Sequence, residues 1–293
     1  MRLEYAGLRT LIAPLQAMSP DRASAVSGWL WRQFAPHTRR HARVREHIAA
    51  AFPELAASER DRIALASWEN LGRVFGEAVH VDRIAMDPER VELPDDIDHY
   101  RRLARKGCVF VSLHLGNWEL AAAPALGKDI AIAGTYQAIQ NPLVERYVRS
   151  LREPIYRGGL FPKGHAAARQ TIALAKSGGA VGFLADLRER RGIKLSFFDR
   201  PAYANPFPAA IARRADVPIV AGCLVRTKGV HFRLHVREVE QARSNDRDRD
   251  IVETTQAIHD LFEHWIRRFP EQWMWSHRKW ALRPEDTPKN EQR

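Results

Sequence analysis

The 293-residue sequence contains only two cysteines, Cys108 and Cys223, and it has no long uninterrupted run of apolar residues. Two cysteines cannot form a disulfide framework, and their separation does not match the ligand spacing of a zinc site. A membrane-spanning helix needs about 20 mostly apolar residues, and no window of the sequence provides them. The first residues mix Glu4, Arg9 and Asp21 with apolar side chains, so we expect no secretory signal. These absences exclude a disulfide-rich scaffold and a bundle of membrane helices, and they fit a reducing cytoplasm.

Internal repeats, low-complexity linkers and the Gly-rich loops that cradle phosphates are also missing from the sequence. Hydrophobic residues make up 45% of the chain and charged residues 28%, which is the composition of a globular protein. A chain of this length can bury most of its apolar surface without disulfides or metals. We therefore expect a folded globular protein rather than a disordered one.

Acidic residues are fewer than basic residues in this sequence. The 46 Lys and Arg residues outnumber the 35 Asp and Glu residues, which gives a formal net charge of +11. Such a surface attracts phosphates and acidic partners, so nucleic acid, anionic lipid and an acidic protein are all candidates. The sequence has no zinc module or RNA-binding signature that would favour nucleic acid among them.

Residues 1–90 are predicted to form a helical extension. Apolar residues recur at helical spacing from the start of the chain, and we expect Pro14 to interrupt the first helix. The Ser-Pro-Asp run at 19–21 has the pattern of a helix start, and the helix that it opens should end near Pro36. A third helix is expected over residues 58–81.

Aromatic residues in the second of these helices precede a basic stretch. Trp29, Trp31 and Phe34 are followed by four arginines and three histidines within residues 37–47. Rings beside cations suit a helix that lies on an anionic membrane surface. The alternative is a core-packing helix followed by a solvated basic face, because charge runs are usually solvated. We expect the extension to associate with a membrane.

From residue 107 onward, apolar runs of strand length alternate with helical segments. The almost continuous apolar run 108–113 predicts a buried strand. Further strands are expected over 130–136, 180–185, 219–225 and 232–236, and helices over 117–126, 142–152, 164–177, 205–215 and 250–269. This alternation predicts an α/β layered domain with a mostly parallel sheet flanked by helices. We divide the chain into the helical extension, residues 1–90, and an α/β domain, residues 91–293.

The most informative segment directly follows the first apolar strand. That strand ends at His114, Gly116 allows a tight turn, and Asn117 can cap a helix that begins with Trp118 and Glu119. On one continuous helix, His114 and Glu119 would point in different directions. Across a strand–turn–helix corner they can converge, at the carboxyl end of a strand where α/β proteins collect their sites.

His114 and Glu119 form a candidate acid–base pair. A neutral imidazole can take a proton from a hydroxyl near neutral pH, and a carboxylate on its other nitrogen stabilises the imidazolium that forms. Amides at the start of the helix could also hold a developing oxyanion. The alternative is a His and a Glu that are only hydrogen-bonded locally at a polar strand end. Cys108 is expected in the core, where it makes no nucleophile.

Residues 114–119, His-Leu-Gly-Asn-Trp-Glu, resemble the HxxxxE signature of the lipid A biosynthesis acyltransferases, the late or lauroyl/myristoyl type within the lysophospholipid acyltransferase superfamily. A lone HxxxxE motif is a weak signal. Further blocks resemble the family in the same order along the chain, over roughly residues 40–284: residues 51–54, residues 68–72, Tyr136 with 141–143, residues 179–182 leading to Asp186, and residues 270–278.

The resemblance implies transfer of a fatty acyl chain from an acyl carrier protein thioester to a hydroxyl of a lipid A precursor. His114 would deprotonate this hydroxyl and Glu119 would orient and charge His114, with no acyl-enzyme, metal or cofactor. Arg152 would grip a phosphate of the acceptor or of the carrier's phosphopantetheine, and Asp186 would support Arg152 or the acceptor. The alternatives are a surface arginine and a carboxylate capping a turn. Asn117 completes the candidate substrate-binding residues.

The implied partners are the acidic acyl carrier protein, an anionic membrane lipid and the membrane surface, and not nucleic acid. The implied location is the cytoplasmic face of the bacterial inner membrane. Trp273, Trp275 and Trp280 lie beside cations, and we expect them either to border the lipid site or to pack onto the core.

The sequence departs from the family pattern in three places. Gln137 stands where many members carry arginine, residues 187–191 differ from the usual continuation after the aspartate, and the N-terminus is more polar than in many relatives. The first two departures bear on the identity of the acceptor and the choice of acyl length, and the third favours peripheral attachment. An acyltransferase for another membrane lipid, or a basic nucleic-acid-binding protein, are the competing hypotheses.

Overall fold

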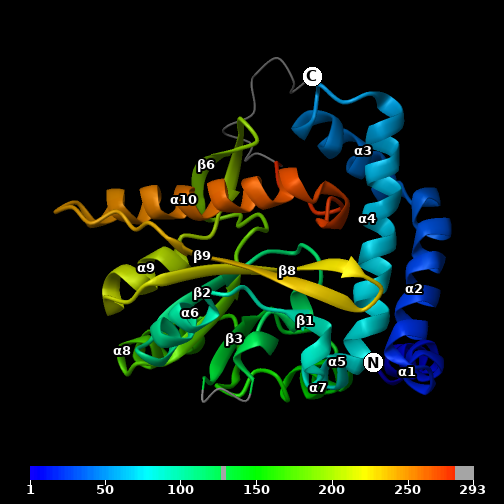
Figure 1. The fold of residues 1–293 in the computed structure, drawn as a ribbon, viewed down its shortest axis with the longest axis horizontal. Coiled ribbons are helices and arrows are strands. Elements are labelled where there is room, and N and C mark those ends of the chain that lie inside the picture. Colours follow the sequence, from blue (N-terminus) through cyan, green and yellow to red (C-terminus); the bar gives the residue numbers. More distant parts are fainter. Residues whose placement is uncertain (127–129, 281–293) are drawn as a thin grey trace.

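A seven-stranded sheet lies at the centre of the protein (Figure 1). The computed structural model describes residues 1–126 and 130–280. The strand order is β1-β9-β8-β2-β5-β3-β4, and all neighbours are parallel except the antiparallel pair β8–β9. The predicted α/β layered fold is therefore confirmed. The strands are β1 (Val91–Glu92), β2 (Cys108–Ser112), β3 (Ile132–Tyr136), β4 (Leu160–Pro162), β5 (Ala180–Leu184), β8 (Ile219–Lys228) and β9 (His231–Val239).

Strand β2 occupies the middle of the sheet because its apolar run can be buried on both faces. It pairs in parallel with β5 on one side and with β8 on the other. The register sets Ser112 of β2 opposite Leu184 of β5, so both strands end at the same edge. His114 and Asp186 each follow two residues later, and the sheet thereby brings these two side chains together.

Helices cover both faces of the sheet. On one face, Val109 and Val111 of β2 pack in a core with Ile211 of α9 and Phe262 of α10. On the other face, Cys108 belongs to a second core, so it is buried as expected. The helices of the alternating half are α6 (Ile97–Arg105), α7 (Pro142–Arg152), α8 (His165–Lys176), α9 (Phe207–Ala215) and α10 (Arg247–Arg268).

The N-terminal region is helical, as predicted, and precedes β1. Figure 1 shows α2 and α4 side by side at one end of the sheet. Their backbones approach closely because glycines face α2: a Cβ on Gly76 would lie 2.5 Å from the Ala23 carbonyl oxygen, and one on Gly72 would lie 2.6 Å from Trp31 Cβ. The helices are α1 (Arg2–Ala17), α2 (Pro20–Phe34), α3 (Arg39–Ala51), α4 (Ala57–Glu77) and α5 (Val81–Ala85).

Two expectations about the helices were wrong. Helix α1 continues through Pro14, because the Thr10 carbonyl that loses its helical donor is exposed to solvent. Residues 117–126 do not form a helix but two short 3₁₀ turns, Trp118–Leu120 and Ala123–Ala125. Pro124 has no amide hydrogen to donate to the Leu120 carbonyl, and Leu120 is completely buried, so solvent cannot replace the lost donor as it can at Thr10.

Several elements were not predicted individually, although α3 and α5 lie within residues 1–90, the region that was expected to be helical. These elements are α3, α5, α6, β1, β4 and a separate hairpin formed by β6 (Ile193–Phe197) and β7 (Arg200–Ala204). The basic stretch near residue 40 is thus part of a helix. The last residues of the expected α/β domain, 281–293, lie outside the described residues. Within the described ranges, every helix is too short or too polar to cross a bilayer.

Candidate active site

His114 and Asp186 form a hydrogen-bonded pair at the carboxyl edge of the sheet. Nδ1 of His114 lies 2.8 Å from Oδ1 of Asp186, and the His114 amide donates to Oδ2 over 3.0 Å. Trp273 also donates to Oδ2 through its indole nitrogen, over 2.9 Å. Three donors therefore surround the carboxylate and fix its orientation.

The surroundings of Asp186 stabilise its negative charge. Burial alone would raise the pKa of this completely buried carboxyl group, but the facing His114 ring and the indole of Trp273 hold it well below its usual range. An ionised carboxylate requires a proton on Nδ1 of His114, so Nε2 is left as the basic nitrogen of the neutral ring. The His114 side chain keeps 13% of its surface exposed and lines a cleft, so this base is accessible.

Lys279 supports Asp186 from behind. Its completely buried ammonium donates to the Asp186 backbone carbonyl over 2.6 Å and lies over the Phe197 ring. Burial lowers the pKa of Lys279 to about 7. Because Trp273 and Lys279 both hold Asp186, the C-terminal segment forms the rear wall of the site. Sequence reasoning marked this segment but missed that role.

Glu119 binds Arg152 and not His114. Both guanidinium contacts, from Nε and Nη2 of Arg152 to the two carboxylate oxygens, measure 2.7 Å. Burial opposes the charge on Arg152, but Glu119 outweighs it and raises the arginine pKa. The expectation that Glu119 orients His114 was wrong. The 3₁₀ turn that replaces the expected helix directs Glu119 toward the end of α7, while the β2–β5 register supplies Asp186 to His114.

Asn117 caps the turn, as predicted, but it does not face the cleft. Its side chain is completely buried, where Oδ1 accepts the Glu119 amide over 3.0 Å and Nδ2 donates to Glu77 over 2.6 Å. The amide of Asn117 donates to Leu224, and that of Gly116 donates to Gln272. The amides of Gly116, Asn117 and Glu119 are therefore already hydrogen-bonded within the protein.

The cleft beside His114 has a polar part and an apolar part. Its volume is about 250 Å³. His114, Glu119 and Arg152 line the polar part, together with the cations of Lys163 and Arg188. Phe110, Ala121 and Ile132 line the apolar part, and the same three residues also line an adjoining apolar pocket of about 60 Å³. The site thus joins a base and a cationic rim to an apolar groove.

The C-terminal tryptophans pack onto the core rather than bordering this cleft. Trp273, Trp275 and Trp280 are all buried, and their rings contact those of Phe197 and Phe198 edge-on or at a tilt. Among the described residues, no group of three or more His, Cys, Asp and Glu side chains is arranged to hold a metal ion.

Comparison with known proteins gives a match over nearly the whole chain. A sequence model of the family described as "Bacterial lipid A biosynthesis acyltransferase" matches residues 4–281. The chain is 24% identical over 264 residues to the lipid A biosynthesis palmitoleoyltransferase of Escherichia coli strain K12. The aligned region covers 84% of this chain and 80% of that relative. The same values hold for a lipid A biosynthesis acyltransferase of Shigella flexneri.

Proposed function

Because the chain belongs to the bacterial lipid A biosynthesis acyltransferase family and is therefore an acyltransferase, we propose that it transfers a fatty acyl chain from an acyl carrier protein thioester to a hydroxyl of a lipid A precursor. The observation that carries this proposal is the His114–Asp186 pair, whose imidazole lines a cleft that is partly apolar. A base next to a groove for a fatty chain is what acyl transfer to a hydroxyl requires.

His114 acts as the general base in the proposed reaction. Nε2 takes the proton of the acceptor hydroxyl while its oxygen attacks the thioester carbonyl, and Asp186 stabilises the imidazolium. The tetrahedral intermediate then collapses, the C–S bond breaks, and the imidazolium returns the proton to the departing thiolate. No covalent acyl-enzyme forms on this route, and burial raises the pKa of the Cys108 thiol to about 12.

The Glu119–Arg152 pair serves substrate binding in this proposal. Arg152 uses Nε and Nη2 on Glu119, and these bonds hold its guanidinium in a fixed plane at the cleft. Its remaining N–H groups suit a phosphate of the acceptor or of the carrier's phosphopantetheine. Lys163 and Arg188 add positive charge to the same cleft.

The apolar groove suits the donor's acyl chain. Ser112, Phe110 and Cys108 lie on one face of β2, and at roughly 3.3 Å per residue they span about 13 Å. One acyl chain spans half of a bilayer's hydrocarbon core, or about 15 Å. The donor's acyl chain begins at the reacting carbonyl, so its whole length can lie in a groove that starts beside His114. In the acceptor, the reacting hydroxyl lies partway along the acyl chain, so the same groove suits the acceptor chain less well.

Membrane attachment is proposed to occur through α1 and α2. Large apolar side chains are exposed on both helices, among them Leu3, Leu11, Trp29 and Phe34. Trp31 instead packs inward against Trp68 and Phe75, so only part of the aromatic set is available to a lipid surface. These exposed apolar side chains, on a chain of net charge +11, suit peripheral binding to anionic lipid at the cytoplasmic face of the inner membrane.

The direct test is product analysis. Purified protein is mixed with acyl carrier protein thioesters and a lipid A precursor, and the lipids are examined by mass spectrometry. We expect one added acyl chain, and in parallel a strain that lacks the gene should lose one secondary acyl chain from lipid A. An unchanged lipid A together with a change in another lipid would assign the enzyme to that other acceptor and would refute the proposal.

A further inference from the structure

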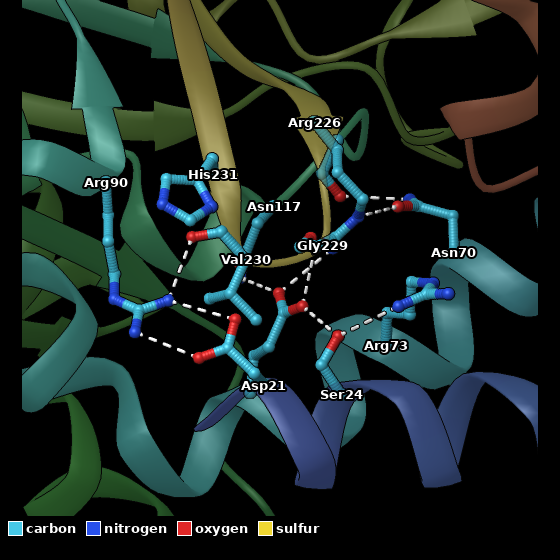
Figure 2. A network of polar contacts seen from close by, with 12 residues as sticks. Asp21, Ser24, Asn70, Arg73, Arg90, Asn117, Arg226, Gly229, Val230 and His231 are labelled. Atoms are coloured by element: carbon cyan, nitrogen blue, oxygen red, sulfur yellow. Dashed lines mark hydrogen bonds and ion pairs between the residues drawn. The ribbon is translucent and has the colours of Figure 1, made fainter. Parts of the chain in front are cut away.

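A buried ion pair lies beneath the turn that carries the site residues. Figure 2 shows Ser24, Asn117 and Arg226 directed toward one another, and the Glu77 carboxylate accepts a hydrogen bond from each. Arg226 contributes Nη1 at 2.6 Å and Nη2 at 2.9 Å, Ser24 contributes its hydroxyl at 2.5 Å, and Asn117 its amide at 2.6 Å. Glu77 is completely buried at the end of α4 and does not line the cleft.

The same network also holds the backbone of the turn. Nε of Arg226 donates to Asn70 Oδ1 over 3.1 Å, and Asn70 Nδ2 donates to the Gly116 carbonyl over 3.0 Å. Gly116 has a φ of +63°, and a Cβ at this position would lie 1.8 Å from the Leu224 carbonyl oxygen. The turn is therefore pressed against β8 in a conformation that only glycine adopts there.

Asn117 connects this network to the cleft. Its amide nitrogen binds Glu77, while its amide oxygen accepts the backbone N–H of Glu119. A single planar group thus links the buried carboxylate to the residue that grips Arg152. If Nδ2 of Asn117 lost its acceptor, the side chain would be free to rotate and the turn would lose its cap.

We propose that the Glu77–Arg226 ion pair is a positioning device, which fixes Asn117 and thereby the orientation of Glu119 and Arg152 toward the substrate. This inference rests on the proposed function. Stability alone does not account for such a pair, because a buried ion pair replaced by apolar residues often costs nothing. Apolar residues at these positions could not accept the hydrogen bond that the Asn117 side-chain amide donates to Glu77. Neither Glu77 nor Arg226 stood out in the sequence.

The test separates positioning from folding. Removing one partner leaves a buried charge unpaired and can unfold the protein, so the main variant is the double substitution Glu77→Leu/Arg226→Met, which removes both charges. The matched control is Asp21→Asn/Arg90→Met, which breaks a neighbouring ion pair of 2.9 Å (Figure 2). Arg90 otherwise binds Asp87 and the Val230 carbonyl rather than the turn. Both variants are compared with the wild type in thermal unfolding, steady-state kinetics, and hydrogen exchange of the amides in residues 114–119.

We expect the Glu77/Arg226 variant to fold, to lose at least about tenfold in kcat/KM for acyl transfer, and to exchange the turn amides faster, whereas the control matches the wild type in all three. Adding Asn117→Ala to the main variant should cost nothing further, because Glu77 acts through Asn117. Unchanged kinetics or unchanged exchange in the folded main variant would overturn the inference. A wild type without acyl transfer would refute the proposed function instead, and the exchange experiment would still decide the positioning claim.

Discussion

The two sides of the cleft differ in what holds them. On the His114–Asp186 side, the carboxylate is completely buried and is braced from behind by Trp273 and Lys279 of the C-terminal segment. The Glu119–Arg152 side is more open, with 28% of the Arg152 side chain exposed, and it is braced from the N-terminal helices through Asn117. In the proposed reaction this difference matches two tasks: proton transfer, which needs a fixed carboxylate shielded from water, and substrate binding, which needs an accessible cation.

The largest expected effect comes from breaking the proton-transfer side. His114→Ala should lower kcat by about 10²–10⁴-fold, because the general base is lost while the cleft remains. Ser112 lines the same cleft, and its hydroxyl makes no hydrogen bond within the described part of the chain. Ser112→Ala should therefore keep most of the activity. Initial rates with a saturating thioester measure both variants, and a dead Ser112→Ala enzyme with an active His114→Ala enzyme would reverse the assignment.

The binding side should respond differently. Arg152→Lys keeps the charge but loses the two-pronged grip of Glu119 and the planar group that faces a phosphate. We expect the KM for the phosphorylated substrate to rise about tenfold, or about 1.4 kcal/mol of binding free energy, with kcat changed much less. Titration of each substrate at a fixed concentration of the other gives the two constants. A fall in kcat alone would place Arg152 in the chemical step.

The proposal that the apolar groove binds the acyl chain can be tested by enlarging a side chain that lines the groove. Ala121 lines both the cleft and the adjoining apolar pocket. Ala121→Phe should reduce transfer of long acyl chains about tenfold relative to short ones, because the added ring fills the groove. Ala125 lines only the adjoining pocket, so Ala125→Phe should spare chains of intermediate length. Competition between thioesters of different chain length measures both, and an unaltered preference would mean that the acyl chain lies elsewhere.

The smallest effect concerns the brace behind Asp186. Burial lowers the pKa of Lys279 to about 7, whereas in the unfolded chain this pKa returns to the ordinary lysine value of 10.5. Between these values the unfolded state binds more protons, so this group makes the free energy of unfolding rise with pH. Lys279→Met should flatten that rise by about 1 kcal/mol per pH unit. Denaturant unfolding from pH 7 to 9 measures the slope, and an identical slope would show that Lys279 is charged throughout.

The sequence predicted the fold class and the position of His114, but not the partner of His114. Local patterns marked the apolar strands, so the mostly parallel sheet followed from their alternation. The Asp186 contact depends on β2 and β5 being neighbours in register, across 72 residues of chain, and no local pattern specifies that pairing. The HxxxxE spacing suggested Glu119 instead, because the segment after Asn117 was taken for a regular helix.

The missed elements have a similar explanation. Helix α6 has apolar residues at helical spacing, Ile97, Tyr100 and Leu103, but with only nine residues it is too short for that spacing to be recognised in the sequence. Strand β7 contains Pro201, which weakens a strand signal. Glu77 and Arg226 lie 149 residues apart, and each looks like an ordinary charged residue in its own element. Their burial and pairing emerge only when α4 packs against the β8–β9 hairpin.

The central claim is that Asp186, and not Glu119, is the carboxylate that serves His114. The most direct measurement is a side-by-side determination of kcat and KM for Asp186→Asn and Glu119→Gln, with folding verified for both. The account predicts a fall in kcat of at least about 100-fold for Asp186→Asn, which disturbs the tautomer and charge of His114, and mainly a higher KM for Glu119→Gln. A larger loss of kcat in Glu119→Gln than in Asp186→Asn would contradict it.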